Sequence, residues 1–478
     1  MKKQITSAAI TKISDSVSID ATPLPPQKPQ FFLLQHDLAE QFAFNDCKQQ
    51  TLSLLTGEAV NGLQPKALAY AGHQFGYFNP SLGDGRAHLL GDIENQSRSR
   101  FELQLKGSGP TRFSRGGDGL STLGSALREY IYSNALHELN IPTTRTLSVM
   151  LTGAGVYRNQ VERGAVSSRI AKTHLRIGTF EYFACRKELN TLAKLVDFAI
   201  SRCNIEPNIH PVIDLLEWVI QKQCYLVAQW QRVGFIHGVM NTDNTTIAGE
   251  TIDFGPCAML GAYRPQACFS SIDQNSRYAF NNQPNIIQWN LLRFAESLLL
   301  LIEDNKALTE QLTLLVQSLP SVMSDHLDLM QANKLGFINA CSKTNNLTRQ
   351  WYAWLESNAV DFTAAHALLL LAVENKALPL AFHQDKTLTA FLLSWRQLLK
   401  DKQLSQAQVK KLLLQHNPHF VLRNKLVEQS ITEAVAKCAA KPVLTYLERC
   451  FSSDAFSDWD NISIFEQFDQ HYQTFCGT

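Results

Sequence analysis

Two side chains near the middle of the sequence, Asn244 and Asp253, are of the types that hold a divalent cation. They lie nine residues apart in the segment His237–Gly255, which reads HGVMNTDNTTIAGETIDFG, and Asp253 opens the tripeptide Asp-Phe-Gly. Carboxylate and amide oxygens are ligands that Mg²⁺ accepts beside phosphate oxygens. In enzymes of phosphate transfer, an Asn and the Asp of this tripeptide hold the Mg²⁺ that bridges the nucleotide phosphates. The pair therefore predicts a metal and nucleotide site.

The same segment lacks the usual catalytic base of a kinase. That base is an Asp near the start of the catalytic loop, two residues after a His. Val239 stands at that position here, whereas an unexpected carboxylate, Asp243, lies beside Asn244. Asp243 is the only carboxylate between His237 and Asn244, so we take it as the candidate proton acceptor.

A kinase also needs a strand Lys paired with a helix Glu, which together hold the phosphates from the opposite side. Lys106 ends a predicted strand, and Glu129 lies 23 residues later on the next predicted helix. Taken alone, the two are better interpreted as a surface Lys and a solvated Glu, because such pairs are common. Their order before Asn244 and Asp253 favours the kinase-like interpretation.

The positions of the glycines and the number of arginines differ from the kinase pattern. Only Gly83-Asp84-Gly85-Arg86 precedes Lys106, and a glycine-rich stretch, residues 107–119, follows it. Glycine-rich backbone can cradle phosphate through its N–H groups, but this arrangement would hold it in a different place. No Gly-x-x-x-x-Gly-Lys-Ser/Thr motif occurs, which excludes a Walker-type NTPase. The β-rich part also carries a surplus of arginines: Arg86, Arg112, Arg115, Arg128, Arg169 and Arg176.

Arginine forks bind phosphate oxygens in a bidentate manner, so this surplus indicates a phosphate site. Arg169 has apolar neighbours on both sides, and we therefore expect it to be buried with a partner.

The elements that must position these residues divide into a β-rich and a helical part. Strands are predicted at Arg86–Ile93, Arg100–Lys106, Thr146–Leu151 and Ala165–Ala171, and a helix from about Ser121 to Leu139. Alternation in the second strand puts Lys106 on a polar face with Glu102 and Gln104. Apolar residues recur at helical spacing from about Phe180 onward, and the last part, from Asn290, is nearly all helical in pattern.

These patterns predict an α+β, two-lobed, protein-kinase-like fold. It comprises a β-rich N-lobe, a helical C-lobe and a helical C-terminal extension. The predicted division is an N-terminal arm and linker at 1–62, an N-lobe at 63–180, a C-lobe with the metal loop at 181–300, and a helical region at 301–478.

Composition narrows the function classes. Of 478 residues, 45% are hydrophobic and 18% charged, which is typical of a globular protein. The formal net charge of +1 predicts neither nucleic acid nor an anionic membrane as a partner. The longest apolar runs are too short to cross a bilayer, and no secretory signal is evident. We expect a cytoplasmic monomer. None of the ten cysteines forms Cys-x-x-Cys, which argues against a structural zinc site.

As a set, the motifs resemble the selenoprotein O (SelO) family, which has a pseudokinase fold; this chain is similar to its cysteine-containing bacterial members. The resemblance covers most of the chain. It is carried by Tyr70–Gly76, Gly83–Arg86, Gln104–Thr111, Ser114–Gly119, Ile141–Arg145, His237–Gly255, Arg277–Phe280, and Asn417-Pro418 with Arg423-Asn424.

The resemblance implies a protein adenylyltransferase that moves AMP from ATP to hydroxyl side chains of proteins, its own included. ATP would bind flipped relative to a kinase, with its γ-phosphate buried. Lys106, Arg169 and Arg176 would hold the buried phosphates, and Glu129 would orient Lys106. The other implied roles are ATP binding by Gly83, Gly85, Arg86, Asp118, Gly119 and Asp253, binding of Mg²⁺ or Mn²⁺ by Asn244 and Asp253, and proton acceptance by Asp243.

Two alternatives remain open at the level of the residues. One is an atypical kinase that transfers phosphate with Asp243 as base, and the other is a non-catalytic ATP-binding scaffold. Family members often end in a selenocysteine or cysteine, and Cys476 fills that position here. A disulfide from Cys476 to Cys268, in the loop after Asp-Phe-Gly, would tether the C-terminus over the active-site side. The alternative is two unrelated thiols in a reducing cytosol.

Overall fold

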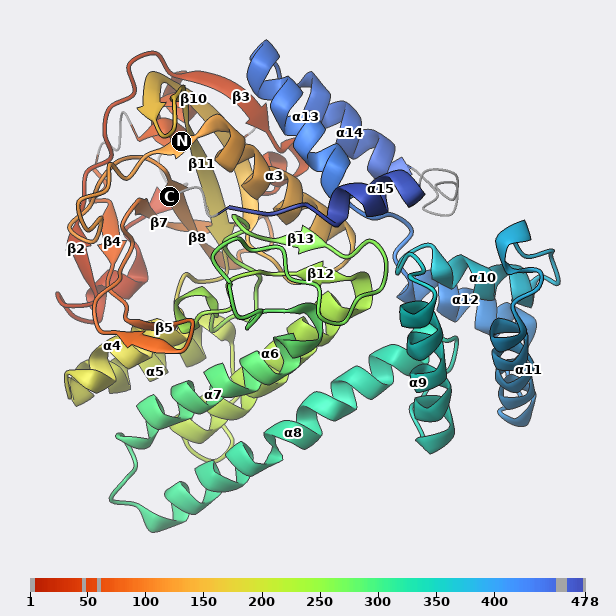
Figure 1. The fold of residues 1–478 in the computed structure, drawn as a ribbon. Helices are drawn as coiled ribbons and strands as arrows, with labels where there is room; N and C mark the ends of the chain where they lie inside the picture. Colours follow the sequence, from red (N-terminus) through yellow and green to blue (C-terminus); the bar gives the residue numbers. More distant parts are fainter. Residues whose placement is uncertain (1–4, 45–48, 58–61, 453–461, 476–478) are drawn as a thin grey trace.

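An antiparallel sheet forms the N-terminal part of the protein, and helices form most of the rest (Figure 1). The computed structural model describes residues 5–44, 49–57, 62–452 and 462–475. The sheet of these residues has nine strands, ordered β2-β4-β7-β8-β11-β10-β3, with β1 on β7 and β9 on β11. Its strands are β1 (Ile5–Thr6), β2 (Ser18–Asp20), β3 (Gln30–Leu34), β4 (Lys66–Leu68), β7 (Ala87–Glu94), β8 (Arg100–Lys106), β9 (Ser121–Thr122), β10 (Arg145–Tyr157) and β11 (Val161–Ala171).

The two central strands carry the residues that matter most for the site. Strand β8 has the predicted bounds and pairs antiparallel with β7 on one side and β11 on the other. Leu103 and Leu105 point into one hydrophobic core, as the alternation predicts. The opposite face, with Glu102, Gln104 and Lys106, is also buried. The polar side of β8 is therefore an interior surface that other elements cover.

The helix α3 (Leu123–Glu138) packs against β10 and β11 and carries Glu129. Thr122 caps its N-terminus by accepting a hydrogen bond from the backbone N–H of Ser125 at 3.3 Å. Eleven residues of this helix are buried, Glu129 among them, so the helix is enclosed on more than one side. This placement holds a carboxylate inside the protein, next to the end of β8.

Most of the remaining chain is helical. The helices are α1 (His36–Gln41), α2 (Gln49–Thr56), α4 (Ile177–Cys185), α5 (Leu189–Cys203), α6 (Pro211–Val233), α7 (Gln283–Leu299), α8 (Lys306–Lys334), α9 (Ser342–Ser357), α10 (Ala365–Val373), α11 (Lys386–Asp401), α12 (Gln406–His416), α13 (Asn424–Lys437), α14 (Lys441–Ser452) and α15 (Ile462–Asp469). Short 3-10 turns lie at Ala9–Lys12, Thr242–Asn244, Phe280–Asn282 and Leu380–Phe382.

Helix α6 delivers the chain to the predicted metal loop. It begins at a proline, whose fixed φ suits the first turn, and ends before Gly234, which has a φ of +78°. The chain then enters the short strand pair β12 (Phe235–Ile236) and β13 (Ala258–Met259), and His237–Gly255 runs between its two strands. A second hairpin, β5 (Gly72–Gln74) with β6 (Tyr77–Asn79), lies against α4 and the turn at 242–244.

The C-terminal helices form two groups (Figure 1). Helices α9 to α12 lie beyond one end of α8 and share a core that includes Trp351 and Trp395. Helices α13 and α14 return to the sheet and contact α3. Within the range 1–62, predicted to be an arm and linker, residues 5–34 contribute three strands to the sheet. No helix of the described residues combines the length and the apolar character that a membrane span requires.

Candidate active site

A cleft of about 390 Å³ lies between the β-rich part and the loop 239–256. Its lining includes every residue for which sequence reasoning predicted direct contact with nucleotide, metal or transferred proton. These residues are Gly83, Gly85, Arg86, Lys106, Asp118, Gly119, Arg169, Arg176, Asp243, Asn244 and Asp253. The fold thus gathers side chains from positions 83 to 253 around one space.

Lys106 lines the cleft at the point where β8 ends. Its Nζ is 2.8 Å from Glu129 Oε1 and also contacts the carboxylate of Asp253. The same Glu129 oxygen accepts a hydrogen bond from the backbone N–H of Phe254 at 3.1 Å. Glu129 therefore fixes both the strand Lys and the backbone that follows Asp253.

Two arginines complete a cationic group around Asp253. Arg169 Nη1 donates to Asp253 Oδ1 at 2.9 Å, and Arg176 Nη1 lies 3.4 Å from Oδ2. Burial alone would raise the pKa of Asp253, but Lys106, Arg169 and Arg176 outweigh it and hold the pKa well below its usual range. Arg169 is 2% exposed, which confirms the expectation that it is buried with a partner.

Asp84 and Gln104 connect the two arginines, and sequence reasoning assigned no role to either. Gln104 accepts a hydrogen bond from Arg169 Nη2 at 2.6 Å and donates to Asp84 Oδ2 at 2.9 Å. Asp84 Oδ1 lies 3.6 Å from Arg176 Nη2. The available signals were the position of Asp84 inside Gly83–Arg86 and the place of Gln104 on the face of β8 that carries Lys106.

Asp243 is a buried carboxylate, and one of its oxygens has no hydrogen-bond donor among the described residues. Gln74 Nε2 donates to its Oδ2 at 3.2 Å, whereas no described residue donates a hydrogen bond to Oδ1. Burial raises the pKa of Asp243 to about 6, against the opposing effect of Arg176. Asp243 lines the cleft, and a carboxylate with a raised pKa there is of the type that accepts a proton from a bound hydroxyl group.

The backbone closes tightly around Asp243. A Cβ on Gly72 would lie 2.8 Å from Asp243 Oδ1, and one on Gly178 would lie 2.1 Å from the carbonyl oxygen of Ala71. Arg176 Nη1 donates to the backbone carbonyl of Asp243 at 2.7 Å, which ties the loop to the arginine pair. Two close backbone approaches therefore set the position of this side chain.

Asn244 and Asp253 fit the chemistry of a Mg²⁺ or Mn²⁺ site. The side-chain nitrogen of Asn244 donates to the carbonyl of Val239 at 3.1 Å, so the amide oxygen is the atom that can bind a cation. Asp253 has a φ of +65°, a region that side-chain-bearing residues seldom adopt and that concentrates at functional sites. A hard cation accepts such an amide oxygen and carboxylate.

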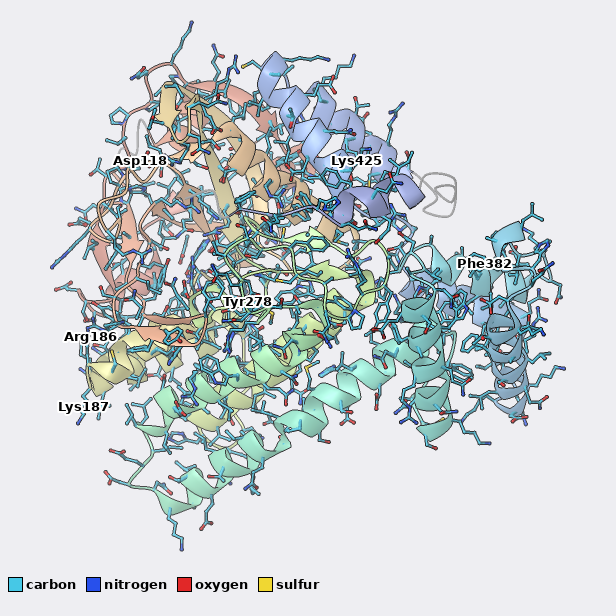
Figure 2. All side chains as sticks on the ribbon, in the orientation of Figure 1. Asp118, Arg186, Lys187, Tyr278, Phe382 and Lys425 are labelled. Carbon is cyan, nitrogen blue, oxygen red and sulfur yellow. The ribbon has the colours of Figure 1, made fainter. Side chains whose placement is uncertain are left out.

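Polar contacts from the hairpin β5–β6 hold the loop before Asn244. His73 Nδ1 lies 2.6 Å from Glu181 Oε1, and Thr242 donates to the other oxygen of Glu181 at 2.5 Å. Asn241 Oδ1 accepts hydrogen bonds from the Tyr278 hydroxyl and from the backbone of the hairpin. Tyr278 lies near the centre of the molecule in Figure 2, among the segments that surround this loop.

The glycine-rich segments form the outer wall of the cleft. Gly83 has a φ of +69°, and a Cβ there would lie 2.2 Å from the ring of Phe113, so only glycine fits. Asp118, which Figure 2 shows on the sheet side of the molecule, pairs with Arg158 at 2.7 Å. The hydrogen bonds from Arg158 lower the pKa of Asp118. Arg158 is a further lining residue that sequence reasoning missed.

Cys268 lies in the segment after Asp-Phe-Gly and is partly buried. Its Sγ is 3.3 Å from Asp273 Oδ2, and burial together with that carboxylate raises the thiol pKa to about 11. Cys476 lies outside the described residues. The predicted Cys268–Cys476 disulfide therefore stays a prediction.

Comparison with known proteins agrees with this geometry. The family model described as "Protein adenylyltransferase SelO" matches residues 5–451. The "Protein nucleotidyltransferase YdiU" of Bradyrhizobium sp. strain BTAi1 is 40% identical, with 98% of this chain and 97% of the relative covered. Proteins of the same description from Teredinibacter turnerae and Bacillus thuringiensis subsp. konkukian are each 38% identical, with 98% of this chain and 98% and 97% of the relative covered. The chain therefore belongs to the SelO family of protein adenylyltransferases.

Proposed function

We propose that this adenylyltransferase moves AMP from ATP to the hydroxyl groups of Ser, Thr or Tyr side chains in proteins, its own included. Its relatives are described as protein nucleotidyltransferases, which supports protein as the acceptor. The observation that carries the proposal is the pairing of two features in one cleft. Three cationic side chains, Lys106, Arg169 and Arg176, line it together with the carboxylate-bearing residue Asp243.

The cationic group supports a flipped orientation of ATP. Lys106, Arg169 and Arg176 offer buried donors that match the charge of the β- and γ-phosphates. The backbone of Gly83–Arg86 and of Asp118-Gly119 would complete the nucleotide pocket along the outer wall. In this orientation the α-phosphate, and not the γ-phosphate, is presented to an acceptor.

Asn244 and Asp253 would hold the divalent cation, either Mg²⁺ or Mn²⁺. When bound, the cation neutralises phosphate charge and polarises the P–O bonds. Glu129 keeps Lys106 directed toward the phosphates through the 2.8 Å contact. These residues supply positioning and charge, which dominate catalysis of phosphate-group transfer.

The proposed reaction is a displacement at the α-phosphorus. The acceptor hydroxyl oxygen forms a bond to phosphorus, the bond to the oxygen bridging to the β-phosphate breaks, and pyrophosphate leaves. The hydroxyl proton passes to the carboxylate of Asp243. Burial favours the protonated form of this carboxyl group, so the proton is accepted readily.

Labelled ATP tests the reaction and separates it from the alternatives. Label on the α-phosphate should transfer to protein, and label on the γ-phosphate should not. Transfer of γ-label alone would establish an atypical kinase, and transfer of neither label would leave a scaffold. Intact-mass measurement after incubation with ATP and Mg²⁺ provides a second readout, because an AMP adduct and a phosphate adduct differ in mass.

A kinase-like division of the chain is part of the proposal. The antiparallel sheet with α3 would be the N-lobe, the segment around α4 to α7 the C-lobe, and the helices from residue 301 an extension. The contacts of Lys106, on the sheet, with Glu129, on α3, and with Asp253, in the loop after α6, support this division. Limited proteolysis that cut first near residues 62, 180 and 300 would agree with it.

A disulfide between Cys268 and Cys476 is also proposed, with a regulatory tether as its role. Thr474 pairs with the strand-like segment at Ser270, so the chain reaches this segment two residues before Cys476. Peptide mapping of the oxidised protein should recover the linked pair, and reduction should remove it. Free thiols at both positions after oxidation would contradict the tether.

A further inference from the structure

Arg128 links the C-terminal region to the Asp-Phe-Gly segment. It lies on α3, and its side chain is 12% exposed. Its Nε donates to the carbonyl of Gly255 at 3.1 Å, and its Nη2 donates to the carbonyl of Cys257 at 2.7 Å. Its Nη1 contacts the carboxylate of Glu428 on α13 and lies 3.2 Å from the hydroxyl of Tyr472. One guanidinium thus joins backbone that follows Asp253 to two side chains from the C-terminal end.

The contacts at the C-terminal end form a consistent donor and acceptor chain. Arg128 donates to the Tyr472 hydroxyl, and that hydroxyl donates to Glu428 at 2.7 Å. Two residues later, Thr474 donates its hydroxyl to the carbonyl of Pro256 at 2.7 Å and pairs by its backbone with Phe269. The C-terminal residues Tyr472 and Thr474 therefore contact both Arg128 and the segment that follows Asp-Phe-Gly.

Arg128 is also adjacent to the predicted phosphate site along α3. The next residue, Glu129, holds Lys106 and the backbone of Phe254. In kinases, activity requires the Lys–Glu pair and the Asp of Asp-Phe-Gly to be in place together, and the position of the helix controls this. Contacts that fix Arg128 therefore affect both the Lys106–Glu129 pair and the position of Asp253.

We infer that Arg128, Glu428 and Tyr472 form a positioning clamp, through which the C-terminal region sets the geometry of the Asp-Phe-Gly segment. The inference rests on the proposed role of Asp253 as a metal ligand. Arg128, Glu428 and Tyr472 are not among the residues that line the cleft; they would act through the carbonyls of residues 255 and 257. An ion pair such as Arg128–Glu428 need not contribute much to the free energy of unfolding. The test must therefore measure the position of the Asp-Phe-Gly segment as well as the stability of the fold.

The test uses Tyr472→Phe and Glu428→Gln, singly and together, in the full-length protein. Each variant should lower kcat for protein adenylylation about tenfold, which corresponds to about 1.36 kcal/mol. Each should also raise the Mg²⁺ concentration needed for half-maximal rate, because a less fixed Asp253 binds the cation less tightly. The double variant should fall short of the product of the single effects, since both side chains act through Arg128.

The matched control is Glu433→Gln on the same helix. Glu433 is largely exposed and pairs with Lys437 in the helix, so the identical chemical change should leave kcat and the Mg²⁺ requirement as in the wild type. A general loss of helix stability would affect both glutamate variants, whereas loss of the clamp affects only Glu428→Gln.

Hydrogen exchange supplies a readout that does not depend on the reaction. Amides of residues 253–259 should exchange faster in Tyr472→Phe and Glu428→Gln than in the wild type and in Glu433→Gln. Wild-type exchange there, together with an unchanged Mg²⁺ requirement, would overturn the clamp. If the wild-type protein transferred no α-label, the proposed function would fail, while the exchange result would still decide whether the clamp exists.

Discussion

Replacing Gln104 by Met should cost the protein both stability and ATP affinity. Gln104 is fully buried and makes two hydrogen bonds to charged partners, at 2.6 Å from Arg169 and 2.9 Å to Asp84. Methionine fills a similar volume but can neither donate nor accept these bonds. A hydrogen bond to a charged group contributes roughly 1.5–3 kcal/mol. The loss of both predicts a decrease of roughly 3–6 kcal/mol in the free energy of unfolding.

The same change should weaken ATP binding, because Gln104 fixes one arginine directly and the other through Asp84. If the less well oriented arginines reduce the binding free energy by about 1.4 kcal/mol, the Kd for ATP rises about tenfold. Urea unfolding measures the first quantity, and calorimetric titration of the folded protein with ATP and Mg²⁺ measures the second.

Leu105→Met is the matched control on the same strand. Leu105 is fully buried and apolar, and a volume-conserving swap of this kind costs under about 1.5 kcal/mol. If Gln104→Met lost no more stability than Leu105→Met and bound ATP with wild-type affinity, the network between the two arginines would have no role, and the reasoning would be refuted.

Three further outcomes are expected. Asp253→Ala should abolish transfer of the α-label, because it removes a charged metal ligand. Asn244→Ala removes a neutral ligand and should weaken transfer strongly. Near-normal transfer by Asp253→Ala at ordinary Mg²⁺ concentration would contradict the metal site. Asp243→Asn should lower kcat by about 10²–10⁴-fold if it removes a general base, and retained turnover would argue for a structural role. Burial raises the pKa of Glu250 to about 8, so the folded state binds this proton more tightly than the unfolded state. The associated stability is complete below the unfolded pKa and is lost as pH rises through about 8. Urea unfolding midpoints should therefore fall with rising pH across this range in the wild type and less so in Glu250→Gln; equal slopes would contradict the burial of this carboxyl group.

Local patterns predicted the elements that carry the site with useful accuracy. The bounds of β8 follow from the alternation of Leu103 and Leu105 with polar residues, and the helix predicted from about Ser121 to Leu139 is α3, at Leu123–Glu138. Strands β10 and β11 run farther than predicted, to 145–157 and 161–171, because pairing with each other extends them beyond their most apolar residues.

The sequence pattern did not show which side chains meet across the fold; tertiary contacts determine this. Alternation identifies which residues of β8 share a face, but it does not show that Gln104 and Lys106 face an enclosed site. Arg158 and Tyr472 were not predicted as partners of Asp118 and Arg128, because they come from distant parts of the chain. Long-range pairings of this kind leave no periodic signal in a single sequence.

The cationic group around Asp253 has a thermodynamic consequence for the order and strength of ligand binding. In this structure the carboxylate serves as the internal counterion of Lys106, Arg169 and Arg176. A polyphosphate that takes over those cations displaces the carboxylate, which then requires a positive partner of its own. If the three cations hold a polyphosphate and Asp253 holds a divalent cation, as proposed, the two ligands bind with positive cooperativity, and linkage requires that each raise the affinity of the other by the same factor. Nucleotide free of metal would meet a competing negative charge already in place, so the resting protein discriminates against it before any reaction begins.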